Sequence, residues 1–139
     1  MRKIQVLAVD FDGTICHSVY PDATDINLTA IDVLKRFRNH GGEIILWTCR
    51  KGQALDNAVK ACLNAGLEFD AVNAEAPRQQ AAWLANHAED IGVTPSPKVY
   101  ADMYIDDHSR WDETDVDWSK IDKRINSPLN FNGAEEDIA

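Results

Sequence analysis

Short apolar runs and amphipathic stretches alternate along the chain. Residues 4–9, 43–48, 69–72 and 99–105 are mostly apolar, and such short runs are typical of buried strands in a parallel sheet. Between them, apolar side chains recur at intervals of three and four residues, which predicts amphipathic helices. The helical positions are Ala30, Val33, Leu34 and Phe37, then Leu55, Ala58, Val59, Cys62 and Leu63, then Ala81, Leu84, Ala85 and Ala88.

Turn and capping residues mark the ends of these helices. Thr29 and Asp32 have the spacing of a capping pair, and the glycine pair 41–42 ends the first helix. Pro77 suits the first turn of the third helix. Strands and helices therefore alternate, which predicts an α/β fold: a doubly wound, mostly parallel sheet with helices on both faces. In such sheets, ligands bind at the carboxyl ends of the strands.

The chain of 139 residues suits one domain. We expect residues 1–108 to form the core and residues 109–139 to form an acidic extension with eight acidic and four basic residues. Trp118, Ile121 and Ile125 are spaced for one short helix in this extension. We expect it to pack on the core or on a second subunit, with a frayed end after Gly133.

Composition narrows the classes of function. The formal net charge is −9, and an acidic chain repels nucleic acids and anionic membranes, so we expect no general binding to either. No apolar stretch approaches the roughly 20 residues of a membrane span. The three cysteines form no C-x-x-C pair and no disulfide framework, which favours a reducing cytoplasm.

Four carboxylates lie at the ends of two expected strands. Asp10 and Asp12 follow the first strand, and Asp106 and Asp107 follow the last. If these strands are neighbours, the acids meet at one edge and repel one another unless a hard cation such as Mg²⁺ binds between them. Lys98 adds a positive charge, so the site is expected to accept a phosphate held by metal and ammonium together.

Four motifs occur in a fixed order: residues 10–14 (DFDGT), residues 46–48 (LWT), Lys98, and residues 104–107 (YIDD). This order resembles the haloacid dehalogenase superfamily of phosphatases, over roughly residues 4–108. The resemblance implies a Rossmann-like core. The loop after the first motif and the segment 74–97 are too short for a sizeable cap domain, so the chain resembles the capless members.

The resemblance also implies roles for individual residues. Asp10 resembles the nucleophile that forms an aspartyl-phosphate, and Asp12 resembles the general acid/base, whose backbone carbonyl would bind Mg²⁺. Thr48 and Lys98 resemble the residues that bind and neutralise the phosphoryl group. The implied metal ligands are Asp10, Asp12, Asp107 and Asp106.

These observations predict a Mg²⁺-dependent phosphomonoester hydrolase that acts on a small phosphorylated substrate. Arg50, Lys51 and His17 are candidates for contacts with that substrate, although a solvated loop would explain the first two equally well. A phosphoacceptor signalling module and a non-catalytic metal-binding relative are the alternatives. The sequence leaves open the substrate, the oligomeric state, which of Asp106 and Asp107 binds the metal directly, and the role of the extension.

Overall fold

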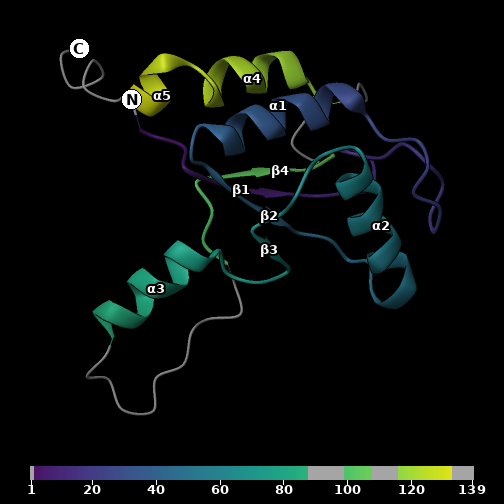
Figure 1. Cartoon of the computed structure of the whole chain (residues 1–139), viewed down its shortest axis with the longest axis horizontal. Coiled ribbons are helices and arrows are strands. Elements are labelled where there is room, and N and C mark those ends of the chain that lie inside the picture. Colours follow the sequence, from purple (N-terminus) through teal and green to yellow (C-terminus); the bar gives the residue numbers. More distant parts are fainter. Residues whose placement is uncertain (1, 88–98, 108–115, 133–139) are drawn as a thin grey trace.

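A parallel sheet of four strands forms the centre of the fold (Figure 1). The structure is a computed structural model that describes residues 2–87, 99–107 and 116–132. The spatial order of the strands is β3-β2-β1-β4, and every pair of neighbours is parallel. The strands are β1 (Val6–Val9), β2 (Glu43–Leu46), β3 (Ala71–Val72) and β4 (Met103–Ile105).

The helices join and cover these strands. They are α1 (Leu28–Asn39), α2 (Gly52–Asn64), α3 (Pro77–Asn86), α4 (Trp118–Ile125) and α5 (Pro128–Asn132). Pro77 stands in the first turn of α3, as predicted. The predicted capping pair of α1 is wrong, because Asn27 caps this helix and its side chain accepts the backbone N–H groups of Thr29 and Ala30. In the described part of the chain, no helix has the length and apolarity needed to cross a membrane.

The strand order confirms the doubly wound fold. The chain runs from β1 outward to β2 and β3, and then returns past β1 to form β4 on its other side. The order reverses at β1, and ligands of such sheets bind beside this point, at the carboxyl ends of the strands. The expected proximity of the first and last strands is confirmed, because Leu7, Ala8 and Val9 pair with Met103, Tyr104 and Ile105.

The predicted last strand is shorter than expected, because it starts at Met103 rather than at Val99. Asp102 explains part of this difference. Its carboxylate accepts the N–H groups of Gln5 and Val6, at 2.7 and 3.0 Å, where a neighbouring strand would supply carbonyl groups. The side chain thus supplies acceptors at the start of β1, while the N–H of Asp102 donates to the carbonyl of Val6 at 2.8 Å.

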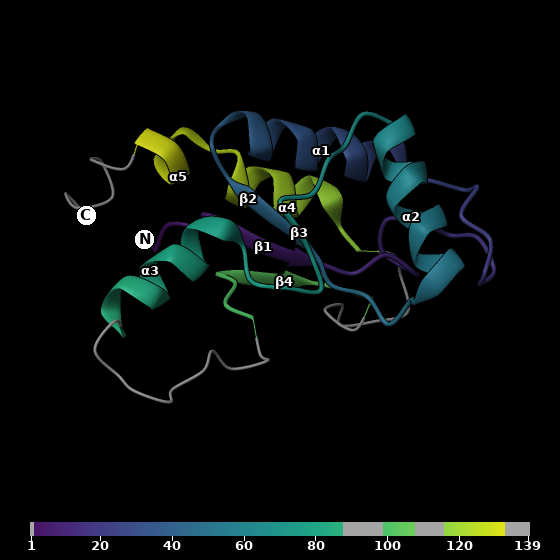
Figure 2. The ribbon, with the colours of Figure 1, turned by 60° about the horizontal axis from the view of Figure 1, so that its bottom comes forward.

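The two faces of the sheet are covered very differently. Helices α1 and α4 lie side by side over one face (Figures 1 and 2). On this face, large side chains such as Leu7, Leu34, Phe37 and Trp118 form the main core. Helix α3 lies on the opposite side of the sheet (Figure 2). It contributes no buried residue within its bounds, and the small core on this face is made mostly of alanine and valine.

The C-terminal helices belong to the core of the domain. Trp118 and Ile125 of α4 are buried in the main core, and Asn130 of α5 is also buried. The Asn130 side chain accepts the N–H of Ile4 at 2.6 Å and donates to the carbonyl groups of Ile4 and Ile125, at 2.7 and 2.8 Å. It therefore connects α5 to the chain just before β1. The expected frayed end, from Gly133 onward, lies outside the described residues.

We expect Asn130→Ala to lower the free energy of unfolding by about 2–4 kcal/mol, because it leaves buried backbone groups of Ile4 and Ile125 without partners. Urea unfolding followed by circular dichroism measures this loss. Lys123→Ala, at an exposed position of α4, is the control and should change stability by less than about 0.5 kcal/mol. Equal effects of the two substitutions would contradict the connecting role of Asn130.

Candidate active site

The carboxyl ends of all four strands meet around one cavity of about 450 Å³. Asp10 follows β1, and its N–H donates to the carbonyl of Ile105 at 2.9 Å, so the pairing of β1 with β4 continues into the site. Asp106 and Asp107 directly follow β4. The lining residues are Asp10, Trp47, Thr48, Cys49, Asn73, Asp106 and Asp107.

The carboxyl group of Asp10 has a raised pKa. The pKa lies at about 6 instead of 3.8, mainly because the group is partly buried, and the charges of Asp107, Asp12 and Asp106 contribute to the same rise. One interaction opposes these effects, because the N–H of Phe11 donates to Oδ1 of Asp10 at 2.8 Å. The site therefore gathers negative charges around the Asp10 side chain, which is partly removed from water.

Gly13 allows the acids to approach one another. Its φ of +76° lies in the left-handed region, and a Cβ at this position would lie 2.8 Å from Oδ2 of Asp107. Any larger residue would strain the backbone and press against this carboxylate. The glycine of the D-x-D-G motif thus makes room for the acid at the end of the neighbouring strand.

Thr48 is held in place by hydrogen bonds on both sides. Its N–H donates to Oδ1 of Asn73 at 2.8 Å, and its hydroxyl oxygen accepts the N–H of Arg50 at 3.1 Å. Because the hydroxyl oxygen accepts this bond, the hydroxyl proton remains available to donate into the cavity.

Sequence reasoning missed Asn73. Its φ of 50° is left-handed, and its N–H donates to the carbonyl of Leu46 at 2.8 Å. Asn73 thereby connects the ends of β2 and β3 and orients the backbone of Thr48. An asparagine directly after a short strand is one of the few residues that tolerate this conformation, and that signal was present in the sequence.

The Arg50 side chain is not placed to contact a substrate, contrary to the expectation from the sequence. Its side chain is only 1% exposed, and two of its N–H groups donate to the two carboxylate oxygens of Asp12, at 2.9 and 2.7 Å. The remaining donors bind the backbone carbonyl groups of Pro21, Asp22 and Ala54. These five bonds use the whole guanidinium, and the proximity of Asp12 raises its pKa.

The aromatic rings of Phe11 and Tyr20 enclose the Arg50 guanidinium, with centroids 4.7 and 5.1 Å away. Arg50 therefore joins the D-x-D motif, the loop that follows it and the start of α2. The side chain of Asp12 binds Arg50 and does not line the cavity. The four expected carboxylates lie near one another, since the charges of Asp12, Asp106 and Asp107 all act on Asp10, but only three of them line the cavity, because the fourth binds a buried guanidinium.

The other expected residues lie outside the cavity lining. Lys51 is exposed and stands at the N-terminus of α2. His17 is exposed in the loop before α1, where its N–H donates to the carbonyl of Asp25. Lys98 lies outside the described residues. Among the residues that are described, no group of three or more histidine, cysteine, aspartate or glutamate side chains is arranged to hold a metal ion.

We expect Asp10→Asn to stabilise the protein at pH 8 by about 1–2 kcal/mol in the absence of divalent ions, after allowance for partial exposure. A carboxylate with a raised pKa lowers stability as the pH rises from 3.8 to about 6, and this cost persists at higher pH. The gain should therefore shrink toward zero below pH 4. Urea unfolding at pH 4 and pH 8 in the presence of EDTA measures it.

Asp56→Asn is the control for this measurement, because it removes an exposed carboxylate on α2. It should produce little difference at either pH. A destabilising effect of Asp10→Asn at pH 8 would show that the acids are not crowded in the way the structure describes.

We expect Arg50→Lys to cost about 2–4 kcal/mol of stability, because lysine keeps the charge but cannot serve five acceptors at once. Arg36→Lys is the matched control. Arg36 pairs with Asp32 and Asp122 at a side chain that is 41% exposed, so its replacement should cost less than about 1 kcal/mol. Thermal and urea unfolding distinguish the two, and a neutral Arg50→Lys would return Arg50 to the candidates for substrate contact.

Comparison with known proteins gives one informative match. No protein-family model matches the chain, and no curated protein matches it. A solved structure, that of a conserved protein encoded by a Bacteroides thetaiotaomicron locus, is 31% identical to the chain, with a TM-score of 0.66. The match covers 99% of this chain and 98% of the other. At this identity over nearly the full length of both, the chain belongs to the same family as this conserved Bacteroides protein.

Proposed function

We propose that the protein is a Mg²⁺-dependent phosphomonoester hydrolase of the haloacid dehalogenase type, with Asp10 as its nucleophile. The observation that carries this proposal is the cavity at the point where the strand order reverses. There Asp10, which follows β1, lies in one lining with Thr48, which follows β2, and with Asp106 and Asp107, which follow β4. This arrangement joins a nucleophile, a hydroxyl donor and additional oxygen ligands at one place.

In the first step, a carboxylate oxygen of Asp10 attacks the phosphorus atom. The bond between phosphorus and the ester oxygen breaks, and this oxygen keeps the electron pair and takes up a proton. In the second step, a water molecule loses a proton and attacks the phosphorus of the aspartyl-phosphate. The Asp10 carboxylate is released, and inorganic phosphate leaves the site.

Asp12 is the proposed carrier of these protons. Both of its carboxylate oxygens are held by Arg50, at 2.7 and 2.9 Å. To reach the ester oxygen, Asp12 must give up one of these two bonds, while the other keeps the side chain near the cavity. Arg50 is therefore a positioning residue in this proposal and does not contact the substrate.

The phosphoryl oxygens carry negative charge that the site must balance. The hydroxyl of Thr48 supplies one hydrogen bond, and Lys98 is proposed as a cation on the basis of the sequence motif alone. Magnesium suits the remaining donors, because it binds oxygen and usually takes only one or two carboxylates, with water and phosphate oxygens completing its shell. Asp10, Asp107 and the backbone carbonyl of Asp12 would hold it, and the ion would neutralise charge on the phosphoryl group.

The proposal predicts Mg²⁺-dependent release of phosphate from p-nitrophenyl phosphate. Asp10→Asn should lower kcat by more than about 10³-fold, because it removes the nucleophile. Thr48→Val should lower kcat by about 10²-fold, because it removes one donor to the phosphoryl group. EDTA should abolish the activity, and added Mg²⁺ should restore it. Asp56→Asn is again the matched control and should keep full activity.

Acid-quenched samples provide a second test, which also separates an enzyme from a signalling module. Wild-type protein should carry a phosphoryl group that Asp10→Asn lacks, and this group should turn over within seconds. A phosphoprotein that persists for minutes to hours without turnover would favour the signalling alternative. Full phosphatase activity in Asp10→Asn would contradict the proposed mechanism.

A further inference from the structure

Four residues, one after each strand, form a row across the carboxyl end of the sheet. In the row beneath them, Ala8 of β1 pairs with Ile45 of β2 and with Tyr104 of β4, and Ile45 pairs with Ala71 of β3. Because side chains alternate along a strand, the residues two positions farther on continue the same face. These residues, which all line the cavity of the candidate active site, are Asn73, Trp47, Asp10 and Asp106.

Trp47 stands directly beside Asp10 in this row. Leu46 pairs with Val9, and Trp47 and Asp10 are the residues that follow these two partners. The N–H of Trp47 donates to the carbonyl of Val9 at 2.9 Å, so the pairing of β1 with β2 continues to this point. Neighbouring strands lie about 4.8 Å apart, and Trp47 is therefore next to the place where Asp10 would hold a phosphoryl group.

Packing within the domain does not account for the Trp47 side chain. The residue is 37% exposed and belongs to neither of the two cores, although Ile45 and Leu46, which precede it, are fully buried. Single exposed apolar residues are common on protein surfaces, but this one lines the cavity that contains the proposed nucleophile. Its indole is therefore available to a molecule bound at Asp10.

The charges around Trp47 limit the kind of group that can lie against it. The described lining of the cavity contains Asp10, Asp106 and Asp107 and no lysine or arginine. Arg50, which follows Trp47 by three residues, is bound to Asp12 instead. The described lining thus provides no cation for a second anionic group of the substrate, and its carboxylates would repel such a group.

We propose that Trp47 contacts the leaving group of the substrate and that this group carries a flat, uncharged ring close to the ester oxygen. The ring stacks on the indole, which stabilises it beyond the burial of apolar area alone. It lies close to the ester oxygen because Trp47 is next to the nucleophile. The substrate class is then a phosphomonoester with a planar ring in its leaving group and no second anionic group. This inference rests on the proposed phosphatase function.

The test compares kcat/KM for benzyl phosphate and cyclohexylmethyl phosphate. Both esters release a primary alcohol of similar size, and only the first has a flat ring. We expect the benzyl ester to be preferred by about 2- to 12-fold, because stacking on Trp47 adds to the apolar contact that both rings make. Trp47→Leu should bring this preference close to 1, and Trp47→Phe should keep most of it.

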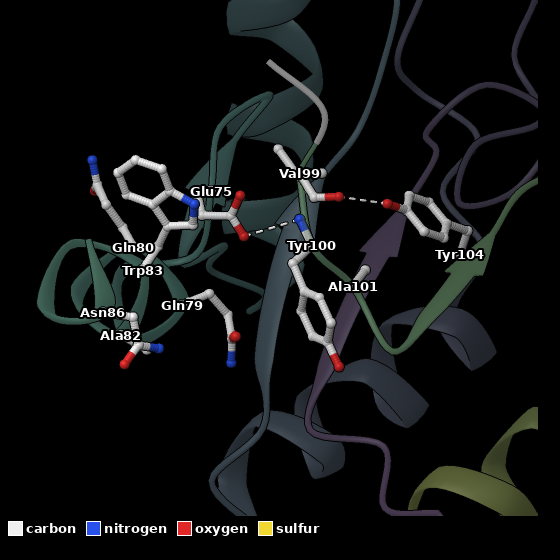
Figure 3. A pocket seen from close by; sticks show the side chains of 10 residues that line it. All are labelled: Glu75, Gln79, Gln80, Ala82, Trp83, Asn86, Val99, Tyr100, Ala101 and Tyr104. Carbon is white, nitrogen blue, oxygen red and sulfur yellow. Dashed lines mark hydrogen bonds between the residues drawn. The ribbon is translucent and has the colours of Figure 1, made fainter. Parts of the chain in front are cut away.

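Trp83→Leu is the matched control, because it removes the same kind of side chain from a different cavity. Trp83 lines a cavity between α3 and the segment that leads into β4, which shares no described lining residue with the cavity of Asp10 (Figure 3). This substitution should leave the preference unchanged. If the benzyl ester is not preferred, or if Trp47→Leu leaves the preference intact, the inference is wrong although the phosphatase function stands.

If neither ester nor p-nitrophenyl phosphate is hydrolysed, the proposed function fails, and a binding measurement decides about Trp47. Benzylphosphonate, which has no ester bond, is titrated into wild-type protein in the presence of Mg²⁺ and followed by NMR. Saturable shifts that Trp47→Leu abolishes would support a site for a ring beside Asp10. Shifts that are absent from the wild type, or that Trp47→Leu leaves unchanged, would overturn it.

Discussion

The pairing of β1 with β4 is the constraint on which the site depends. These strands are far apart in the sequence, and their parallel register places Asp10 beside Asp106 and Asp107. The fold thereby gathers like charges that raise the pKa of Asp10 in addition to the effect of its burial. Hydrophobic burial of both strands must offset this cost, since Leu7, Val9 and Ile105 are all part of the main core. A site that is unfavourable by itself is held together by the sheet beneath it.

Arg50 shows how the same region is made stable enough to persist. A buried guanidinium is costly unless all of its donors are used, and Asp12 with three backbone carbonyl groups satisfies it. Because these carbonyl groups belong to the loop after β1 and to α2, one side chain fixes the geometry of two segments around the cavity. Arg50, two residues after the expected phosphate-binding Thr48, is thus better explained by what it holds in place than by a contact with substrate.

Much of the fold could be predicted from the sequence, because it follows from the spacing of apolar residues and from the glycine and proline residues that mark the ends of helices. The apolar runs before Asp10 and Asp106 predicted the neighbouring strands β1 and β4, and the acids after them predicted the cavity. Side-chain pairing could not be predicted in the same way. Asp12 and Arg50 are 38 residues apart, and only the folded chain shows that their side chains bind each other. Asn27 and Asn73 were missed for a related reason, since each takes its role from the hydrogen bonds that its position offers.

The unequal cover of the two faces of the sheet follows from the strand order. The connection from β3 back to β4 must cross the face opposite α1, and α3 is the helix that makes this crossing. Since the residues beneath it are small, among them Ala8, Ala71 and Ala101, α3 has little apolar surface to pack against. The helix therefore leaves a cavity of about 640 Å³ between its side chains and the segment that leads into β4. The same strand order thus places the acids at the carboxyl ends of the strands and a loosely packed helix near the amino end of β2, where Arg78 of α3 contacts Gly41 and Glu43.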